Sequence, residues 1–342
     1  MSRIVRKRKP QAPPESPLAA LMEKHLDALR IQNYSEYTIK GRRVHIRFFL
    51  DWCQERGITE PVDVTRTVLE SYQRHVFHYR KKNGEPLGFR GQHDRLVPLR
   101  VWFRWMARQH HILHNPASEL ELPRTGFRLP KAVLTANEAE QIIQMSNVHT
   151  PLGLRDRAIL ETLYTTGMRR IELISLKLWD LDLERATVII RQGKGKKDRV
   201  IPLGDRTALW MRKYLDESRP QLVSEPDDKT VFLSNAGEPL ALDYLTEVVR
   251  GYVDDANVGK RGACHLFRHT MATLMLEGGA DIRFIQAMLG HADLKTTQIY
   301  THVAIRQLQK IHRATHPAKL EGEKRELLEA LEADDDDSEI SK

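Results

Sequence analysis

The sequence predicts a mainly α-helical protein with one small β-sheet, organised as two domains. The chain has 342 residues, which is longer than one typical domain. With 41% hydrophobic residues it can bury a sizeable core, so two domains are expected. Apolar residues recur at helical spacing from residue 18 to residue 111. β-branched runs at 186–191 and 199–203 have the composition of strands. We therefore expect a helical amino-terminal domain and a carboxyl-terminal domain that combines helices with a β-hairpin.

The amino-terminal part is predicted to contain a basic arm and a helical domain. Residues 1–16 are rich in arginine, lysine and proline, which is typical of a flexible arm that lies on DNA phosphates or stays in solvent. In the domain over residues 17–118, aromatic residues at helical spacing are expected in the core, and the arginines between them are candidates for DNA contact. The expected helices span 18–31, 35–56, 64–79 and 93–110, and the candidate arginines are Arg42, Arg43, Arg47, Arg100 and Arg104.

Charge is distributed unevenly along the chain, whose formal net charge is +8. Residues 1–130 contain 24 basic and 13 acidic side chains, whereas residues 319–342 contain 4 basic and 10 acidic ones. Clustered positive charge is typical of proteins that bind a phosphate backbone, although a merely soluble basic surface has the same composition. The charge distribution therefore suggests a polyanionic partner. The acidic tail, 319–342, is expected to stay in solvent or to dock on another protein.

A linker over residues 119–131 is predicted between the domains, because Pro123, Gly126 and Pro130 interrupt regular structure. The second domain, 132–318, is expected to open with a helix whose capping box pairs Thr135 with Glu138.

The two β-branched runs flank a turn that contains two glycines, so Lys194 is expected near the tip of a hairpin. Lys196 and Lys197 in the same turn are further candidates for DNA contact. The expected helices of this domain span 153–165, 169–176, 208–215, 240–254, 265–277, 282–289, 295–300 and 305–311.

Cysteine usage and hydropathy argue against several classes of protein. Cys53 and Cys264 lie far apart and form no CxxC pair, so neither a zinc site nor a disulfide framework is expected. No stretch approaches the roughly 18 apolar residues of a membrane span. The expectation is a cytoplasmic, DNA-associated protein without a metal ion or another cofactor and without a membrane partner.

Two arginines and a histidine are candidates for binding a phosphate. Phosphoryl transfer depends on neutralising the non-bridging oxygens. The planar fork of arginine suits this because it donates two parallel hydrogen bonds and stays charged. Arg169 and Arg268 are the candidates for this role, and His291 is a candidate for a hydrogen bond to a phosphate oxygen in the transition state.

A nucleophile, a base and an acid complete the predicted chemistry. The hydroxyl of Tyr300 has an ordinary pKa of about 10, so it must lose its proton or lie beside positive charge before it attacks at neutral pH. His265 is the candidate acceptor of that proton. The departing 5′-oxygen needs an acid, for which Lys194 is the candidate.

Simpler explanations exist for the same residues. His265 and His269 are four apart, as in a metal pair on one helix face, but Arg268 would repel a cation and the glutamate of an HExxH motif is missing. A tyrosine at helical spacing is often a packed side chain. The Lys194 turn does not match a P-loop, because its spacing and its final residue differ.

Five ordered motifs carry a resemblance to a known family. They are Thr166-Gly167-Met168-Arg169, Gly193-Lys194-Gly195, His265-Leu266-Phe267-Arg268-His269, Leu289-Gly290-His291 and Thr296-Thr297-Gln298-Ile299-Tyr300-Thr301-His302. In this order they resemble the Arg-Lys-His-Arg-His-Tyr signature of the tyrosine site-specific recombinases, in particular the Xer-type and integrase branch. The resemblance covers residues 18–315, with no departure at the six signature positions.

The resemblance implies a helical SAM-like core-binding domain and a mixed α/β tyrosine-recombinase catalytic domain that together clamp duplex DNA. It implies site-specific recombination through a 3′-phosphotyrosyl bond and a Holliday junction, without metal or ATP. It also implies a homo- or hetero-tetramer on two DNA sites, for which a helix at 305–311 could dock on a neighbour. The implied roles are phosphate binding for Arg169 and Arg268, assistance from His265 and His291, acid catalysis by Lys194 and nucleophilic attack by Tyr300.

Two other functions remain open at this point. A type IB topoisomerase uses similar chemistry on a single site and exchanges no partner strands, and two domains with Xer-like spacing argue against it. A DNA-binding accessory protein would only occupy a site, and it would have no physical need for Tyr300 or Lys194.

Overall fold

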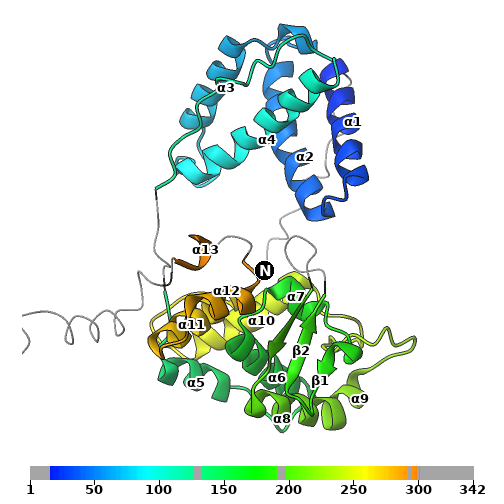
Figure 1. The fold of residues 1–342 in the computed structure, drawn as a ribbon, viewed down its shortest axis with the longest axis vertical. Helices are drawn as coiled ribbons and strands as arrows, with labels where there is room; N and C mark the ends of the chain where they lie inside the picture. Colours follow the sequence, from blue (N-terminus) through cyan, green and yellow to red (C-terminus); the bar gives the residue numbers. More distant parts are fainter. Residues whose placement is uncertain (1–15, 127–131, 192–197, 292–294, 299, 301–342) are drawn as a thin grey trace, which may run out of the picture. The chain divides into compact units, whose positions relative to one another are not determined.

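The computed structural model describes residues 16–126, 132–191, 198–291, 295–298 and 300. The chain forms two compact units, Met1–Phe127 and Arg128–Lys342 (Figure 1). The division lies inside the 119–131 segment that the sequence predicts as a linker. No helix among these described ranges is long and apolar enough to cross a membrane.

The first unit is built from helices that side chains cap at their starts. Ser16, Ser35 and Thr65 each accept a hydrogen bond from a backbone N–H at the third position beyond them, which satisfies a donor that the helix cannot pair. The helices are α1 (Pro17–Ile31), α2 (Glu36–Gln54), α3 (Arg66–His78) and α4 (Phe89–Arg108), with a 3₁₀ turn η1 (Pro61–Asp63).

Helix α4 begins four residues before the predicted start at residue 93. Gly88 is its N-cap, and the Gln92 side chain donates to the Leu87 carbonyl at 2.8 Å, which fixes this first turn. This start is hard to predict from the sequence, because a glycine at an N-cap is a weaker signal than serine or threonine.

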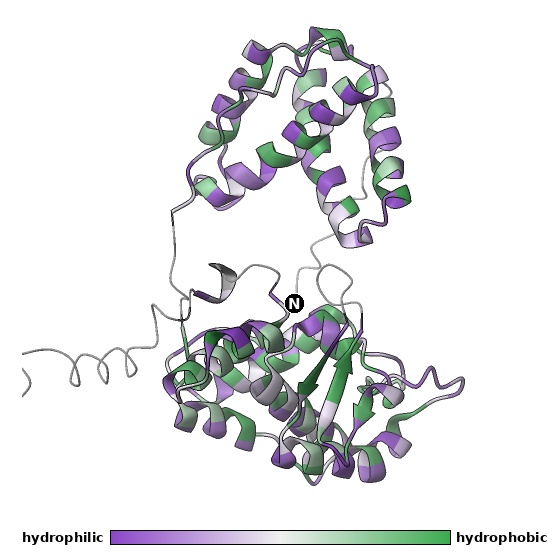
Figure 2. Cartoon of the chain, in the orientation of Figure 1, coloured by the Kyte–Doolittle hydropathy of each residue, from purple (hydrophilic) through white to green (hydrophobic). Residues whose placement is uncertain are grey.

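Aromatic side chains form the core of the first unit, as their helical spacing predicted. Phe49 is fully buried and makes edge-to-face contacts with Tyr72 and Phe103, at centroid separations of 5.0 and 6.0 Å. Figure 2 shows apolar and polar residues alternating around these helices, as expected for amphipathic helices that pack on one face.

The second unit combines helices with a three-stranded antiparallel sheet in the order β1-β2-β3. Val188 pairs with Ile201 and Ile190 with Arg199, which is the predicted hairpin. The strands are β1 (Leu181–Asp182), β2 (Thr187–Ile190) and β3 (Arg199–Pro202); the helices are α5 (Ala136–Gln144), α6 (Pro151–Thr166), α7 (Arg170–Ile174), α8 (Asp205–Lys213), α9 (Arg219–Leu222), α10 (Leu242–Asp255), α11 (Cys264–Glu277), α12 (Ile282–Leu289) and α13 (Lys295–Gln298), with a 3₁₀ turn η2 (Leu178–Asp180).

Several predicted boundaries of the second unit differ from the structure. Strand β1 was not predicted, because two residues are too few for a periodic pattern. The helix expected at 208–215 continues through a π-helical turn, η3 (Tyr214–Ser218), into α9. The helix predicted at 305–311 lies outside the described residues.

Helix α6 is nearly all buried and packs against α5, α8 and α11. It ends at Gly167, whose φ of +57° is the left-handed conformation that favours glycine. A Cβ at this position would lie 2.3 Å from Met271 Cε and 3.2 Å from Leu289 Cδ2. The glycine therefore lets the chain turn tightly between α11 and α12 just before Arg169.

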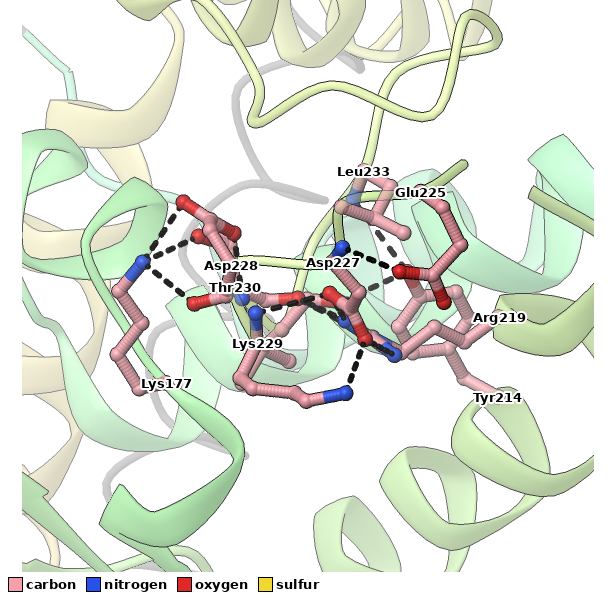
Figure 3. A network of polar contacts seen from close by, with 10 residues as sticks. Lys177, Tyr214, Arg219, Glu225, Asp227, Asp228, Lys229, Thr230 and Leu233 are labelled. Atoms are coloured by element: carbon pink, nitrogen blue, oxygen red, sulfur yellow. Dashed lines mark hydrogen bonds and ion pairs between the residues drawn. The ribbon is translucent and has the colours of Figure 1, made fainter. Parts of the chain in front are cut away.

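A polar network closes the loop that follows α9 (Figure 3). Arg219 donates to both carboxylate oxygens of Asp227, at 3.2 and 2.8 Å, and to the Thr230 carbonyl. Lys177, beyond α7, donates to Asp228 and Thr230 at 2.9 and 2.8 Å.

The Arg219 hydrogen bonds hold the pKa of Asp227 well below its usual range. The stability that this carboxylate contributes is therefore present above about pH 4 and is lost as the pH falls through its lowered pKa.

We expect Arg219→Met to lower the free energy of unfolding by about 3 kcal/mol, because the substitution leaves a buried carboxylate and a buried carbonyl without their main donor. Urea denaturation at pH 7 measures this change. The control is Arg185→Met. The Arg185 side chain is 85% exposed and 3.8 Å from Asp182, so its loss should change stability by less than about 0.5 kcal/mol. Equal effects of the two substitutions would contradict the prediction.

Candidate active site

Arg268 joins the ends of two helices from its place in the first half of α11. It is 4% exposed, and it donates to the carbonyls of Gly167 at 2.6 Å and Leu289 at 2.7 Å. Its Nη2 also lies 2.9 Å from His291 Nε2. Burial lowers the pKa of Arg268 to about 10, which still leaves the guanidinium charged at neutral pH. A permanent cation is thus fixed where α6 and α12 end.

Arg169 lies beside the same helix ends. It is the N-cap of α7, and Glu172 accepts hydrogen bonds from its backbone N–H at 2.8 Å and from its Nη1 at 2.9 Å. Its Nη2 reaches the Gly290 carbonyl at 3.4 Å. Burial favours the protonated acid, but hydrogen bonds from Arg199 and from the Arg169 backbone outweigh it and lower the pKa of Glu172. The ionised carboxylate therefore orients Arg169.

His291 follows the left-handed C-cap Gly290 of α12, and its hydrogen bonds define its tautomer. Arginine has no acceptor, so the Nε2 that faces Arg268 must accept a hydrogen bond. The ring's Nδ1 then carries the proton and donates to Thr297 Oγ1 at 2.8 Å. A hydrogen bond from Nε2 to a phosphate oxygen would require a second proton on this ring.

Tyr300 is 1% exposed and packs in an apolar cluster with Met271, Ile285 and Leu289. Its hydroxyl lies 3.2 Å from His269 Nδ1. Burial raises the pKa of Tyr300, although Arg268 and Arg169 oppose the rise. The phenol is thus protonated at neutral pH, and almost none of the side chain is open to solvent in this structure.

Two histidines lie on the same face of α11, one turn apart. His265 is partly exposed, and its pKa is lowered first by burial of the rest of the ring and then by three arginines, Arg268, Arg170 and Arg169. Burial, His265 and Arg268 lower the pKa of His269 to about 4. Both rings are therefore neutral at pH 7 and able to accept a proton.

The structure brings together most of the residues that were predicted for phosphate chemistry. Arg169, Arg268 and His291 converge on the turn at Gly290, and Thr297 connects this group to Tyr300 because its carbonyl accepts the Tyr300 backbone N–H at 3.0 Å. Lys194, Lys196 and Lys197 lie outside the described residues.

The predicted DNA-contact arginines of the first unit have different surroundings. Arg104 is exposed, whereas Arg100 and Arg47 are half-buried. Arg43 forms an ion pair with Glu23 at 2.8 Å. Arg42 lies over the Tyr34 ring at 5.3 Å, and its Nη1 is buried without a hydrogen-bond partner among the described residues. Arg104 is thus the most accessible of the five.

Sequence reasoning missed four residues of the site. His269 lies four residues after His265 and so had to share its helix face, and Glu172 stands three residues after Arg169, at the usual place for a capping carboxylate. Arg199 and Thr297 gave no sequence signal, because their partners come from distant segments.

No three His, Cys, Asp or Glu side chains within the described ranges gather as a metal site would require. The charged groups at the candidate site are mainly arginines, which suit an anion. The arrangement can therefore bind a phosphate beside a tyrosine.

Comparison with known proteins places the chain in a family. Residues 132–307 match the model of the phage integrase family. The chain is 52% identical over 306 residues to tyrosine recombinase XerC 2 of Ralstonia nicotianae, covering 90% of this chain and 88% of the relative. It is 35% identical over 301 residues to tyrosine recombinase XerD of Listeria monocytogenes serotype 4b, with coverages of 87% and 98%.

Solved structures agree with this assignment. The crystal structure of XerA recombinase is 28% identical with a TM-score of 0.50, covering 87% of this chain and 99% of that one. XerH recombinase bound to its difH substrate after cleavage has the same fold, with a TM-score of 0.66, 22% identity and coverages of 85% and 82%. On these matches and on its ordered site residues, the chain belongs to the phage integrase family and, within it, to the Xer-type tyrosine recombinases.

Proposed function

We propose that this protein carries out site-specific DNA recombination by cutting and rejoining DNA through a covalent 3′-phosphotyrosyl bond at Tyr300. Strand pairs are exchanged one at a time through a Holliday junction, without metal or ATP. The observation that carries the proposal is the convergence of Arg169, Arg268 and His291 on one turn, with Tyr300 connected to it through Thr297. Residues 17–118 are assigned to DNA binding and residues 132–318 to catalysis.

The two arginines supply charge where the transition state needs it. The Arg268 guanidinium has five N–H donors, and three of them point to Gly167, Leu289 and His291. Its Nε–H and one Nη1–H remain for a phosphate, as far as the described residues show. Arg169 adds a second cation at the same turn, where its Nη2 approaches the Gly290 carbonyl. Donors that are fixed before the reaction stabilise developing negative charge without a cost of reorganisation.

The remaining roles concern proton transfer. We assign the proton of the Tyr300 hydroxyl to His265, one turn before the His269 ring that the hydroxyl contacts in this structure, and the protonation of the departing 5′-oxygen to Lys194. The phosphotyrosyl bond preserves the energy of the phosphodiester, so a free 5′-hydroxyl can attack it and reseal the strand.

Known relatives support the choice of partner. The XerH structures contain difH DNA, and a structure of lambda integrase contains a tetramer bound to a Holliday junction. We propose that this chain likewise binds double-stranded DNA in the cytoplasm and assembles as a homo- or hetero-tetramer on two sites.

A covalent-adduct assay tests the proposal. The full chain is incubated in chelator with a random-sequence duplex library, denatured in detergent, and searched for DNA attached to Tyr300. Recovery of a defined sequence from these adducts, and exchange of strands between two such duplexes, is the expected result. On a supercoiled plasmid that carries the recovered sequence, relaxation without strand exchange would instead indicate a topoisomerase. Specific binding without any adduct would indicate an accessory protein.

The cleavage rate should depend on pH through His265. Only the neutral ring accepts a proton, and the lowered pKa of His265 lies below its ordinary value of about 6.5. The rate should therefore be constant from pH 7 to 8 and fall as the pH drops through that lowered value. We expect His265→Gln to cleave at least about 100-fold more slowly and to lose this acid limb, in single-turnover assays from pH 5 to 8. An unchanged acid limb in His265→Gln would remove His265 from the base role.

A further inference from the structure

Arg199, the first residue of β3, uses all three guanidinium nitrogens to connect two helices of the site. Its Nη1 and Nη2 donate to the two carboxylate oxygens of Glu172, at 3.1 and 2.8 Å. Its Nε donates to the Met288 carbonyl in the last turn of α12, at 2.9 Å. The Arg199 side chain is 13% exposed and that of Glu172 is 4% exposed, so little water competes for these hydrogen bonds.

The Glu172 carboxylate is shared between two guanidinium groups. Arg169 donates to it through Nη1 and the backbone N–H at the start of α7, while Arg199 donates to it from β3. Two positive charges and one negative charge sum to +1 for the three side chains. Without Arg199 the pair of Arg169 and Glu172 would be neutral, and its attraction for a phosphate would fall accordingly.

Arg199 also lies against the turn that precedes His291. A Cβ on Gly290 would be 3.0 Å from the Arg199 Cζ atom, so the guanidinium packs directly on that glycine. The Gly290 carbonyl is the one that Arg169 approaches. A single side chain thus contacts the acid that holds Arg169 and the backbone that leads to His291.

We propose that Arg199 is a positioning residue, which neutralises Glu172 and so keeps the charge of Arg169 available to the scissile phosphate. The proposal rests on the recombinase function given above. Arg199 acts through Glu172 and Arg169 and makes no contact with DNA of its own in this role.

Charge balance makes the test specific. Arg199→Met should lower the single-turnover rate of cleavage about 100-fold and change the Kd for the same duplex less than about threefold, since the loss falls on the reacting phosphate. Adding Glu172→Gln removes the unbalanced carboxylate and retains an acceptor for Arg169. The double variant should therefore cleave about tenfold faster than Arg199→Met alone. A purely structural role of Arg199 predicts that the double variant cleaves more slowly than Arg199→Met alone.

Two further variants separate charge from geometry and folding. Arg199→Lys keeps the charge but cannot bridge both oxygens and the carbonyl, so its rate should fall about tenfold. Arg185→Met is the control, because Arg185 lies just before the neighbouring strand β2 and its side chain is 85% exposed; its cleavage rate should stay within about threefold of wild type. If circular dichroism shows that Arg199→Met is unfolded, the cleavage rate of Arg199→Lys becomes the deciding measurement. A wild-type cleavage rate in Arg199→Lys would overturn the proposal.

A substrate with a 5′-bridging sulfur locates the defect. Sulfur leaves without an acid, so it should restore cleavage to Lys194→Ala, whereas Arg199→Met should remain slow on it. Rescue of Arg199→Met by sulfur would place Arg199 in the acid step and overturn the proposal. The wild-type protein is the reference for all of these rates. If it forms no adduct, the recombinase function itself fails, whereas normal wild-type cleavage with unaffected Arg199 variants refutes the role of Arg199 alone.

Discussion

Replacing Tyr300 with phenylalanine should abolish covalent attachment of the protein to DNA while leaving the fold and the DNA affinity nearly unchanged. The substitution removes one hydroxyl, whose partner among the described residues is His269 at 3.2 Å, and leaves the ring in its apolar cluster. Loss of one such hydrogen bond costs about 1 kcal/mol in stability. Loss of the nucleophile should lower the cleavage rate by at least about 10⁴-fold.

End-labelled duplex on a denaturing gel measures this effect, with a filter-binding Kd for the same duplex. Tyr214→Phe is the matched control, because Tyr214 is also fully buried in this unit and its hydroxyl donates to the Val231 carbonyl and accepts from the Leu233 backbone N–H. The Tyr214 variant should retain covalent attachment in its folded state. Strand-linked protein in the Tyr300 variant would assign the nucleophile to a different residue.

The second large effect is expected at Arg268. A lysine at this position keeps a positive charge but has only three donors at one point. It cannot pair the Gly167 and Leu289 carbonyls, face His291 and still donate to a phosphate, as the guanidinium can. We expect Arg268→Lys to lower the single-turnover cleavage rate on the order of 10³-fold, which is the scale for losing fixed donors at a developing oxyanion.

Arg212→Lys provides the comparison for Arg268→Lys. Arg212 is an exposed residue near the end of α8 with one long contact to the Leu183 carbonyl, so its replacement should leave the rate within about twofold. A parallel measurement of duplex Kd separates phosphate chemistry from binding. Cleavage by Arg268→Lys within tenfold of wild type would show that this guanidinium is dispensable at the phosphate.

Local chemistry explains which elements the sequence could predict. The capping box at Thr135 and Glu138 is present with both hydrogen bonds, at 3.2 and 2.6 Å, because both partners lie within one turn. The hairpin at 186–203 was recognisable from its β-branched runs. By contrast, the π-helical turn after α8 and the two-residue β1 depend on packing in the second unit, and neither has a repeating pattern.

The same reasoning applies to the site. The reactive residue types and their order were visible in the sequence, but their mutual orientation was not. The contact between His269 and Tyr300 joins residues 31 positions apart, and that between Arg199 and Glu172 joins residues 27 apart. Such pairs form only when α11, α12 and β3 have packed, so no window of the sequence contains both partners.

The burial of Tyr300 limits unwanted cleavage of DNA outside the recombination site. Withdrawing a large, mostly apolar side chain from its pocket costs about 2 kcal/mol, so roughly one molecule in thirty would have its tyrosine extended at any moment in the absence of DNA. A tyrosine that is buried in this way rarely contacts a phosphate of unrelated DNA. Contacts with the correct DNA can offset a cost of this size, so we expect attack by Tyr300 to depend on those contacts.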